Sequence, residues 1–340
     1  MKTSIKILFF SIICLLIILL GVALGSIYVP LSDIGEIISH KLFSTELSPS
    51  ISKVSISIAW SLRLPRTLLA FLVGGALAVS GTVMQSVLKN PLASSYTLGV
   101  SSGASLGAAL VIAFGFNISF LGMFTLPATG LAFGLLTVFL SVKFASKMDR
   151  NLENNTIILV GMVFSLFVNA LLTLVTAMAS EHVERLTFWQ MGSFALKDWS
   201  SVVVLFPIVV IGVFIIRYYS KEMDIMTFGE EQAFTMGVDV YRLKWVLLGL
   251  SAALTGSAIS FVGVIGFIDL IAPHVVRRIF GSSHRIVIPM SMMFGGSFMV
   301  ICDLIARTII SPSELPVGAI TALVGAPFFA YVYFSKRKDL

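Results

Sequence analysis

The chain has 340 residues, of which 57% are hydrophobic and only 12% are charged, with a formal net charge of +6. A soluble domain carries about 25% charged residues, so this composition excludes a soluble globular protein. The apolar runs are continuous, which also excludes a transmembrane barrel, whose strands alternate apolar and polar residues. The basic residues are spread over the polar connections, which favours orientation in a membrane over nucleic-acid binding.

Apolar segments follow one another along the whole chain. A bilayer span needs about 20 mostly apolar residues, and roughly ten such stretches fit here. We therefore predict an all-α polytopic membrane protein with about ten transmembrane helices in a single domain, residues 1–340. The expected spans are 1–25, 67–88, a segment built on Gly99, Gly103 and Gly107, 120–142, 156–179, 200–216, 245–262, 263–276, 286–306 and 317–334.

The first apolar run, 7–24, follows two lysines and has the charge pattern of a signal peptide. It is longer than a usual signal core, and no clear small-x-small cleavage site ends it. We interpret it as an uncleaved first helix, 1–25. Residues 26–64 are expected to form an exposed outer loop with room for one short helix.

The basic residues test this arrangement. With the N-terminus in the cytoplasm, most of the 23 Lys and Arg residues fall in cytoplasmic connections, as the positive-inside rule requires. Both termini are then cytoplasmic. The basic residues expected outside are Lys41, Lys53, Arg63, Arg66, Arg185, Lys197 and Arg307.

No catalytic or metal-binding pattern stands out, so no enzyme activity and no metal site are expected. Cys14 and Cys302 lie inside apolar segments and are interpreted as small buried residues. The four histidines are scattered, and no G-x-x-x-x-G-K-[ST] loop for ATP is present.

Arg63, Arg66 and Arg307 form a candidate site on the predicted outer side. Pro65 is tolerated in a first helical turn and would hold the first two arginines at the start of a helix. Outward guanidinium groups can bind the carboxylates of a partner protein in bidentate fashion. Anchoring to lipid headgroups is the alternative interpretation.

Two acidic residues lie within apolar segments, where carboxylates are costly. Asp303 and Arg307 are four residues apart, which predicts an ion pair on one helix face. Asp269 precedes Pro273 in the broken segment 263–276, and is expected to bond backbone groups that the proline frees. A proton or cation site at Asp269 is the alternative.

Small residues recur at helical spacing, a pattern that lets helix backbones approach closely in lipid. The repeated sets are Gly74 with Ala78, Gly99 with Gly103 and Gly107, and Gly318 with Ala322 and Ala326. The pieces ALAVSGTVMQSVLKNPLASSYTLGV and SAALTGSAISFVGVIGFIDLIAPHVV also share a small-residue rhythm and a late proline. Since they start five spans apart, they would form an inverted repeat, as in many transporters.

Three blocks of the sequence, 63–104, 263–285 and 314–329, occur in the order found in a known family. With them, the chain resembles the FecCD/BtuC-type permeases, the membrane subunits of bacterial ABC importers for iron-siderophores, haem and cobalamin. The resemblance covers essentially the whole chain. It implies a type II importer permease of ten helices that pairs with an identical or homologous second permease.

The same resemblance implies further partners. Two cytoplasmic ABC ATPase subunits would bind ATP and Mg²⁺, so this chain itself needs no cofactor. An extracytoplasmic substrate-binding lipoprotein would dock through its glutamates on Arg63, Arg66 and Arg307. The cytoplasmic coupling region, 217–244, would seat in the ATPase through a short helix and its glycine stop, at Glu230, Glu231, Ala233 and Gly237.

The family commonly has glycine where this chain has Asp269. The segment around it is therefore not expected to pack as in relatives, and we expect Asp269 to face the pathway or a hydrogen-bonded pocket. A pathway for bulky, polar chelates should be wide and lined by small or polar side chains. Besides Asp269, the candidates for this lining are Met84, Gln85, Ser101, Ser102 and Asn169.

The expected function is import of a ferric siderophore, a choice that follows the family's commonest substrate. Haem and cobalamin are the alternatives within the family. A different class, an ion-coupled secondary transporter that uses Asp269 and Asp303, is also considered. The outward arginines and the long helical cytoplasmic connection argue against this class. An importer that is served by a binding protein and an ATPase needs both features, whereas a secondary transporter needs neither.

Overall fold

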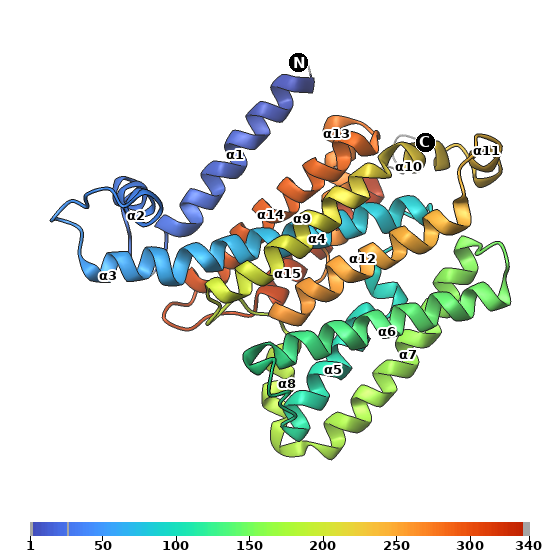
Figure 1. The fold of residues 1–340 in the computed structure, drawn as a ribbon, viewed down its shortest axis with the longest axis horizontal. Coiled ribbons are helices and arrows are strands. Elements are labelled where there is room, and N and C mark those ends of the chain that lie inside the picture. The colour runs from blue at the N-terminus through green and yellow to red at the C-terminus, as the bar shows by residue number, and fades with distance from the viewer. Residues whose placement is uncertain (1–2, 26, 336–340) are drawn as a thin grey trace.

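The computed structural model describes residues 3–25 and 27–335, and every regular element in these ranges is helical (Figure 1). The α-helices are α1 Thr3–Ala23, α2 Leu31–Phe43, α3 Lys53–Ile56, α4 Leu64–Val87, α5 Val100–Phe114, α6 Thr125–Met148, α7 Asn154–Met178, α8 Val183–Gln190, α9 Trp199–Tyr218, α10 Ser220–Met226, α11 Glu230–Thr235, α12 Val240–Val262, α13 Ile268–Phe280, α14 His284–Thr308 and α15 Val317–Ser335. The predicted all-α fold is confirmed. Lys2, Lys336, Arg337 and Lys338, which entered the orientation argument, lie outside the described residues.

Each of the ten predicted apolar segments contains a helix, but the helices differ in length, and residues 263–267 of the segment 263–276 are not helical. Within the described ranges, 7 helices are long and apolar enough to cross a membrane. Helix α5 and the apolar part of α15 are shorter, and α13 has 13 residues with Pro273 inside it. The expected count of ten is therefore approximate, because some of the predicted segments are half-length helices.

The predicted outer loop, 26–64, is more ordered than expected. It contains α2 and α3, and a π-helical turn, Ser57–Arg63, runs directly into α4. Proline has no backbone N–H and clashes with the carbonyl four residues earlier, so a helix that continues through Pro65 must widen there. The N–H of Leu64 bonds to the carbonyl of Ala59, five residues back. The carbonyl of Trp60, left free by this shift, accepts the indole N–H of Trp199 at 2.9 Å.

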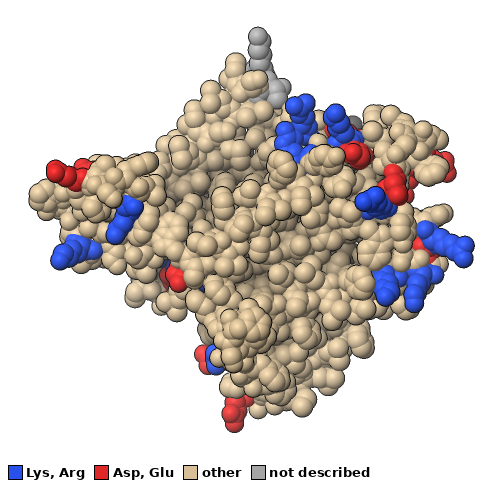
Figure 2. Space-filling view, viewed as in Figure 1, with Lys and Arg blue, Asp and Glu red and all other residues tan. Residues whose placement is uncertain are grey.

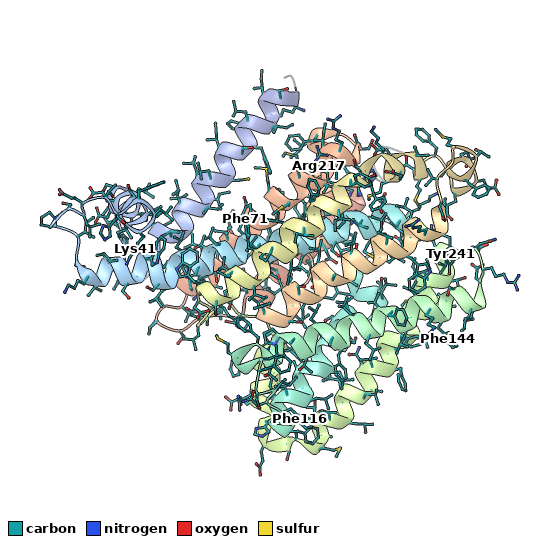
Figure 3. All side chains as sticks on the ribbon, in the orientation of Figure 1. Lys41, Phe71, Phe116, Phe144, Arg217 and Tyr241 are labelled. Carbon is teal, nitrogen blue, oxygen red and sulfur yellow. The ribbon has the colours of Figure 1, made fainter. Side chains whose placement is uncertain are left out.

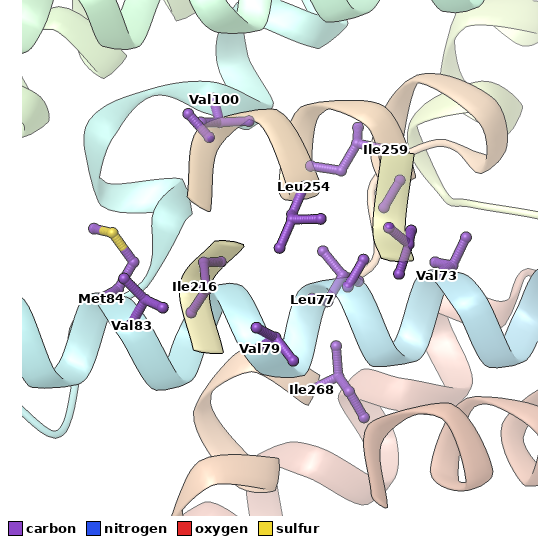
Figure 4. Close-up of a cluster of buried hydrophobic side chains, with 14 of the residues drawn as sticks. Val73, Leu77, Val79, Val83, Met84, Val100, Ile216, Leu254, Ile259 and Ile268 are labelled. Carbon is purple, nitrogen blue, oxygen red and sulfur yellow. The ribbon is translucent and has the colours of Figure 1, made fainter. Parts of the chain in front are cut away.

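Helix α4 is the centre of the molecule. It runs through the middle of the bundle in Figure 1 and packs against α9, α12, α13 and α14. Its residues Val73, Leu77 and Val83 belong to the main hydrophobic core, where they meet side chains of α9, α12 and α13 (Figure 4). Such a helix, apolar on all sides, is typical of a buried span.

Glycines set how closely the helices approach. A methyl group on Gly74 would lie 2.2 Å from the carbonyl oxygen of Gly295 in α14, and one on Gly295 would lie 2.4 Å from that of Gly74. A methyl group on Gly81 would lie 1.9 Å from the carbonyl oxygen of Asp269 in α13. On α5, Gly103 approaches the backbone of Phe133 in α6 in the same way. The small-residue pattern therefore marks backbone-to-backbone contacts.

The two pieces with similar sequence have similar local structures. Helix α4 is followed by a turn with Lys89 and Gly99 at positive φ and then by the shorter α5. Helix α12 is followed by a turn with Gly263 and Phe267 at positive φ and then by the shorter α13. Helices α4 and α12 lie side by side and run in opposite directions (Figure 1), as expected for an inverted repeat.

Prediction on helix packing. Substituting Gly74→Ala should destabilise the permease by about 1–3 kcal/mol, because the added methyl group meets the backbone of α14 and neither helix can yield freely. The matched control is Gly249→Ala on α12, where nothing lies within 4 Å of the added methyl group. Alanine also has the higher helix propensity, so this control should leave the melting temperature unchanged or raise it. Thermal melting in detergent measures the stability of both variants. Equal melting temperatures for Gly74→Ala and the unsubstituted permease would contradict the packing argument.

Candidate functional site

The charged side chains gather at two ends of the bundle. In Figure 2, Lys and Arg are concentrated at the end that carries α10 and α11, and fewer lie at the opposite end, near α2 and α3. We refer to these as the α10–α11 end and the arginine end. Arg63, Arg66 and Arg307 all line one cavity of about 510 Å³ at the arginine end, together with Lys197 and Glu314.

Arg66 is the most strongly bonded of the three arginines. Its Nη2 lies 2.8 Å from Oδ1 of Asp303, and its Nε donates to the same carboxylate at 3.0 Å. Its Nη1 lies 2.7 Å from Oε1 of Glu314. The predicted Asp303–Arg307 pair exists, but at 3.7 Å it is the longer contact. Helical spacing pointed to Arg307, whereas the shorter contact comes from Arg66, 237 residues away in the chain.

Arg63 and Arg307 hold the end of α1. Arg63 Nη1 donates to the carbonyl of Ala23 at 2.9 Å and to that of Val22 at 3.3 Å, and Arg307 Nη2 donates to the carbonyl of Gly21. The last carbonyls of a helix lack partners within it and carry its partial negative charge, so cations are favourable there. Both arginines are only 8% exposed. They are therefore structural residues of this end in addition to any role toward a partner.

The α10–α11 end contains the predicted coupling residues. Glu230 begins α11, Ala233 is buried in the core, and Gly237, at φ 86°, follows the end of this helix. Glu230 Oε2 accepts from the buried Nζ of Lys244 at 2.8 Å. Glu230 and Glu231 line a groove of about 580 Å³, whose other lining residues are Arg150, Asn151, Glu153, Phe234, Thr235, Asp239, Val240 and Tyr241.

Sequence reasoning missed further polar contacts at this end. His284, at the start of α14, bonds through Nδ1 to Asp224 of α10 at 2.6 Å. Arg217 of α9 donates to the carbonyl of Arg285 at 2.6 Å. Lys6 of α1 donates to the carbonyl of Ile279 at 3.0 Å, so α1 starts beside the end of α13. These residues join segments that are distant in sequence, and no local pattern marks their pairing.

Three of the predicted pathway residues come together. Ser101, Ser102 and Asn169 line a cavity of about 310 Å³ between α5 and α7. Ser102 Oγ lies 2.9 Å from Ser165 Oγ across this cavity. The remaining lining residues are Tyr96, Ser105, Leu172, Gln190 and Val264, so the whole lining lacks charged side chains.

The other three predicted pathway residues lie elsewhere. Met84 is fully buried in the hydrophobic core (Figure 4). Gln85 accepts a hydrogen bond from Arg277 Nη1 at 2.6 Å. Asp269 is 1% exposed and accepts from Ser94 Oγ, while its Oδ1 has no partner among the described residues. Met84 has no exposed face in this chain, whereas Gln85 lines a separate cavity of about 290 Å³ with Arg277 and His284. Asp269 lies in a hydrogen-bonded pocket, which was one of the two expectations for it.

Known proteins identify the class of this chain. The model of the FecCD transport family matches residues 13–335, and the chain belongs to this family. The protein is thus a permease of an ABC importer, and the interpretation as an ion-coupled secondary transporter is rejected. Among the described residues, no group of His, Cys, Asp and Glu is arranged to hold a metal ion.

Individual relatives match most of this chain. It is 37% identical over 321 residues to YvrB of Bacillus subtilis, an uncharacterized ABC transporter permease, covering 94% of this chain and 91% of that protein. It is 35% identical to the cobalamin import permease BtuC of Halobacterium salinarum, covering 85% and 77%. It is 33% identical to the hemin transport permease HmuU of Yersinia pestis, covering 96% and 95%.

Further relatives have different substrates in their names. Permeases named for molybdate, Fe(3+) dicitrate and iron(3+)-hydroxamate are each 33–34% identical to this chain. A solved structure, described as the inward-facing conformation of a metal-chelate type ABC transporter, matches with a TM-score of 0.84 and 29% identity. It covers 97% of this chain and 99% of the matched chain.

Prediction on the buried ion pair. Substituting Arg66→Met should destabilise the permease by about 3–5 kcal/mol, because the Asp303 carboxylate, 2% exposed, loses its main partner. The double variant Arg66→Met with Asp303→Leu should recover part of this loss, since it removes the unpaired carboxylate, while Arg307 loses its 3.7 Å contact and keeps its bond to the carbonyl of Gly21. Lys53→Met, at an exposed position of the same end, is the control. Thermal melting measures the stability of all three variants. A double variant less stable than Arg66→Met would refute the interpretation of Arg66 and Asp303 as a buried ion pair.

Proposed function

We propose that this permease imports a ferric siderophore, driven by a separate ATPase at the α10–α11 end and supplied by a binding protein at the arginine end. The observation that carries the proposal is the separation of two interaction surfaces, one rich in arginine and one helical, at opposite ends of a single bundle (Figures 1 and 2). A transporter that receives substrate on one side and energy on the other needs this arrangement.

The arginine end offers carboxylate-binding groups to a partner. Arg66 already holds two carboxylates, and that of Glu314 is 37% exposed. A glutamate of a docking protein could replace Glu314 on the same guanidinium, since both make the same kind of bond. Arg63 and Arg307 line the same cavity and add positive charge, so they contribute to attraction as well as to the local structure.

The α10–α11 end has the features of a docking surface. Phe228, Phe234 and Met236 are 78%, 73% and 63% exposed on or beside the short helix α11. Exposed large apolar side chains clustered on one element usually mark a protein contact. Glu230, Glu231, Ala233 and Gly237 form the core of this element, and we assign them to the coupling with the ATPase.

The lining of the cavity between α5 and α7 supports a chelate as substrate. Its hydroxyl and amide groups can bond to many partners, and its lack of cations disfavours a bare oxyanion such as molybdate. A neutral or bulky iron chelate fits such a lining, and relatives named for hydroxamate and dicitrate complexes of iron support this class. Ser101, Ser102 and Asn169 are the pathway residues that we retain.

Other parts of the proposal concern the membrane and the second permease. The outward faces of α6 and α7 expose large apolar side chains, including Leu166 and Phe167 at 70% and 61%. Lipid and a second permease, identical or homologous, would cover these faces. We assign the permease to a bacterial cell membrane, and the distribution of the basic residues supports placing both chain ends in the cytoplasm.

Prediction on the substrate. The permease, reconstituted in liposomes with its ATPase and binding protein, should take up radioactive ferric hydroxamate only when ATP is supplied. Under the same conditions it should not take up molybdate. Uptake of haem or cobalamin in preference to the iron chelate would refute the siderophore assignment, and uptake without ATP hydrolysis would refute the importer mechanism. Ser102→Phe, which fills the cavity, should abolish uptake, whereas Ser146→Phe at an exposed position of α6 should not.

A further inference from the structure

Lys244 is an unusual residue at the α10–α11 end. It lies near the start of α12, and its side chain is 0% exposed. Lysine is almost never fully buried without a partner, because removing an ammonium group from water is costly. Its burial here therefore calls for specific bonding partners.

Two partners surround the ammonium group, and they come from different segments. Nζ lies 2.7 Å from the carbonyl oxygen of Leu152, in the connection between α6 and α7. It lies 2.8 Å from Oε2 of Glu230, the first residue of α11. One buried charge thus links α12, α11 and the α6–α7 connection. Tyr241 and Phe144, labelled in Figure 3, mark the neighbouring ends of α12 and α6.

The α6–α7 connection is built to present this carbonyl. Asp149 accepts from the backbone N–H groups of Glu153 at 2.7 Å and Asn151 at 2.9 Å, and these hydrogen bonds hold the pKa of its carboxyl below the usual value. Leu152 has φ 51°, a conformation that side chains with a Cβ adopt at a cost. The side chain of Leu152 is fully buried, which fixes the residue in place. The connection is therefore a rigid segment.

Helix α11, by contrast, cannot hold its own position. It has six residues, and helices this short are not stable alone. Its N-cap, Gly229, provides no side-chain hydrogen bond. Among its residues, Ala233 is buried in the core and Glu230 is bound to Lys244. The contact with Lys244 is thus a main determinant of where α11 lies relative to the α6–α7 connection.

We propose that Lys244 is a positioning residue that makes α11 and the α6–α7 connection move as one unit. A displacement of α11 by the ATPase would then pass through Lys244 and Leu152 to α7, which carries Asn169 in the polar cavity. This inference rests on the proposed function for its role in transport. The mechanical link itself is a property of this chain alone.

The direct test measures whether the two segments stay together. Spin labels on cysteines introduced at Asn151 and Thr235, both exposed and outside the apolar surface assigned to the ATPase, report the distance across the groove in the full transporter. With Lys244 present, pulsed electron spin resonance should give one narrow distance that is the same with and without ATP. Lys244→Met keeps the apolar stem but removes the charge, and should broaden this distribution or make it depend on ATP.

The controls separate this role from general damage. Lys147→Met makes the same substitution at an exposed position of α6 and should leave the distance narrow. Glu230→Gln keeps a weaker neutral bond and should broaden it partially, which provides a test even if Lys244→Met fails to assemble. A narrow, ATP-independent distance in Lys244→Met, or in Glu230→Gln when the former does not assemble, would overturn the proposal.

Transport gives the second readout. In Lys244→Met, substrate moved per ATP hydrolysed should fall about tenfold, a typical size for the coupling between two sites. ATP hydrolysis should fall less than transport, whereas a general folding defect would reduce both in proportion. Lys244→Arg should restore most of the coupling. Failure of the unsubstituted protein to transport any chelate would refute the proposed function, while the spin-label distances would still decide the role of Lys244.

Discussion

Close approach between helix backbones is the constraint on which this structure depends. Lipid provides little hydrophobic drive for helices to associate, so packing must come from direct contact of their surfaces. At Gly74 and Gly295, the backbones of α4 and α14 meet with no room for a methyl group. At Gly81, the backbones of α4 and α13 meet equally closely. These contacts place α4 in the middle of the bundle and so fix the positions of both of its ends.

Charged residues at the two ends complete the arrangement. At the arginine end, Arg66 joins α4 to α14 through Asp303, and Arg63 joins α4 to the end of α1. At the α10–α11 end, Lys244 and His284 tie the short helices to the long spans. A buried ion pair contributes little net stability compared with apolar packing, but it penalises any arrangement that separates the partners. The glycine contacts therefore hold the helices, and the charges specify which ends meet.

The sequence predicted the elements better than it predicted their pairing. Continuous apolar runs predicted the helices, and the positions of the basic residues predicted the two charged ends. Hydrophobicity and charge can both be read from short stretches of the chain. The partner of Asp303 was not predictable, because Arg66 is 237 residues away and a helical neighbour was available at Arg307. The π-helical turn before α4 was missed because Pro65 is equally compatible with a helix start. The full burial of Met84 was not predictable for a different reason, since an apolar helix with small residues on several faces does not reveal which face is covered.

The central proposal is that the arginine end faces the exterior of the cell and the α10–α11 end faces the cytoplasm. Labelling of single cysteines with a membrane-impermeant maleimide tests it most directly, at Leu196, which is fully exposed beside the arginine cavity, and at Asn151, which is exposed in the α6–α7 connection at the α10–α11 end. The native Cys14 and Cys302 are buried at 2% and 1% exposure and provide a low background. We expect Leu196→Cys to react in intact cells and Asn151→Cys to react only after the membrane is opened. The reverse pattern would contradict the account.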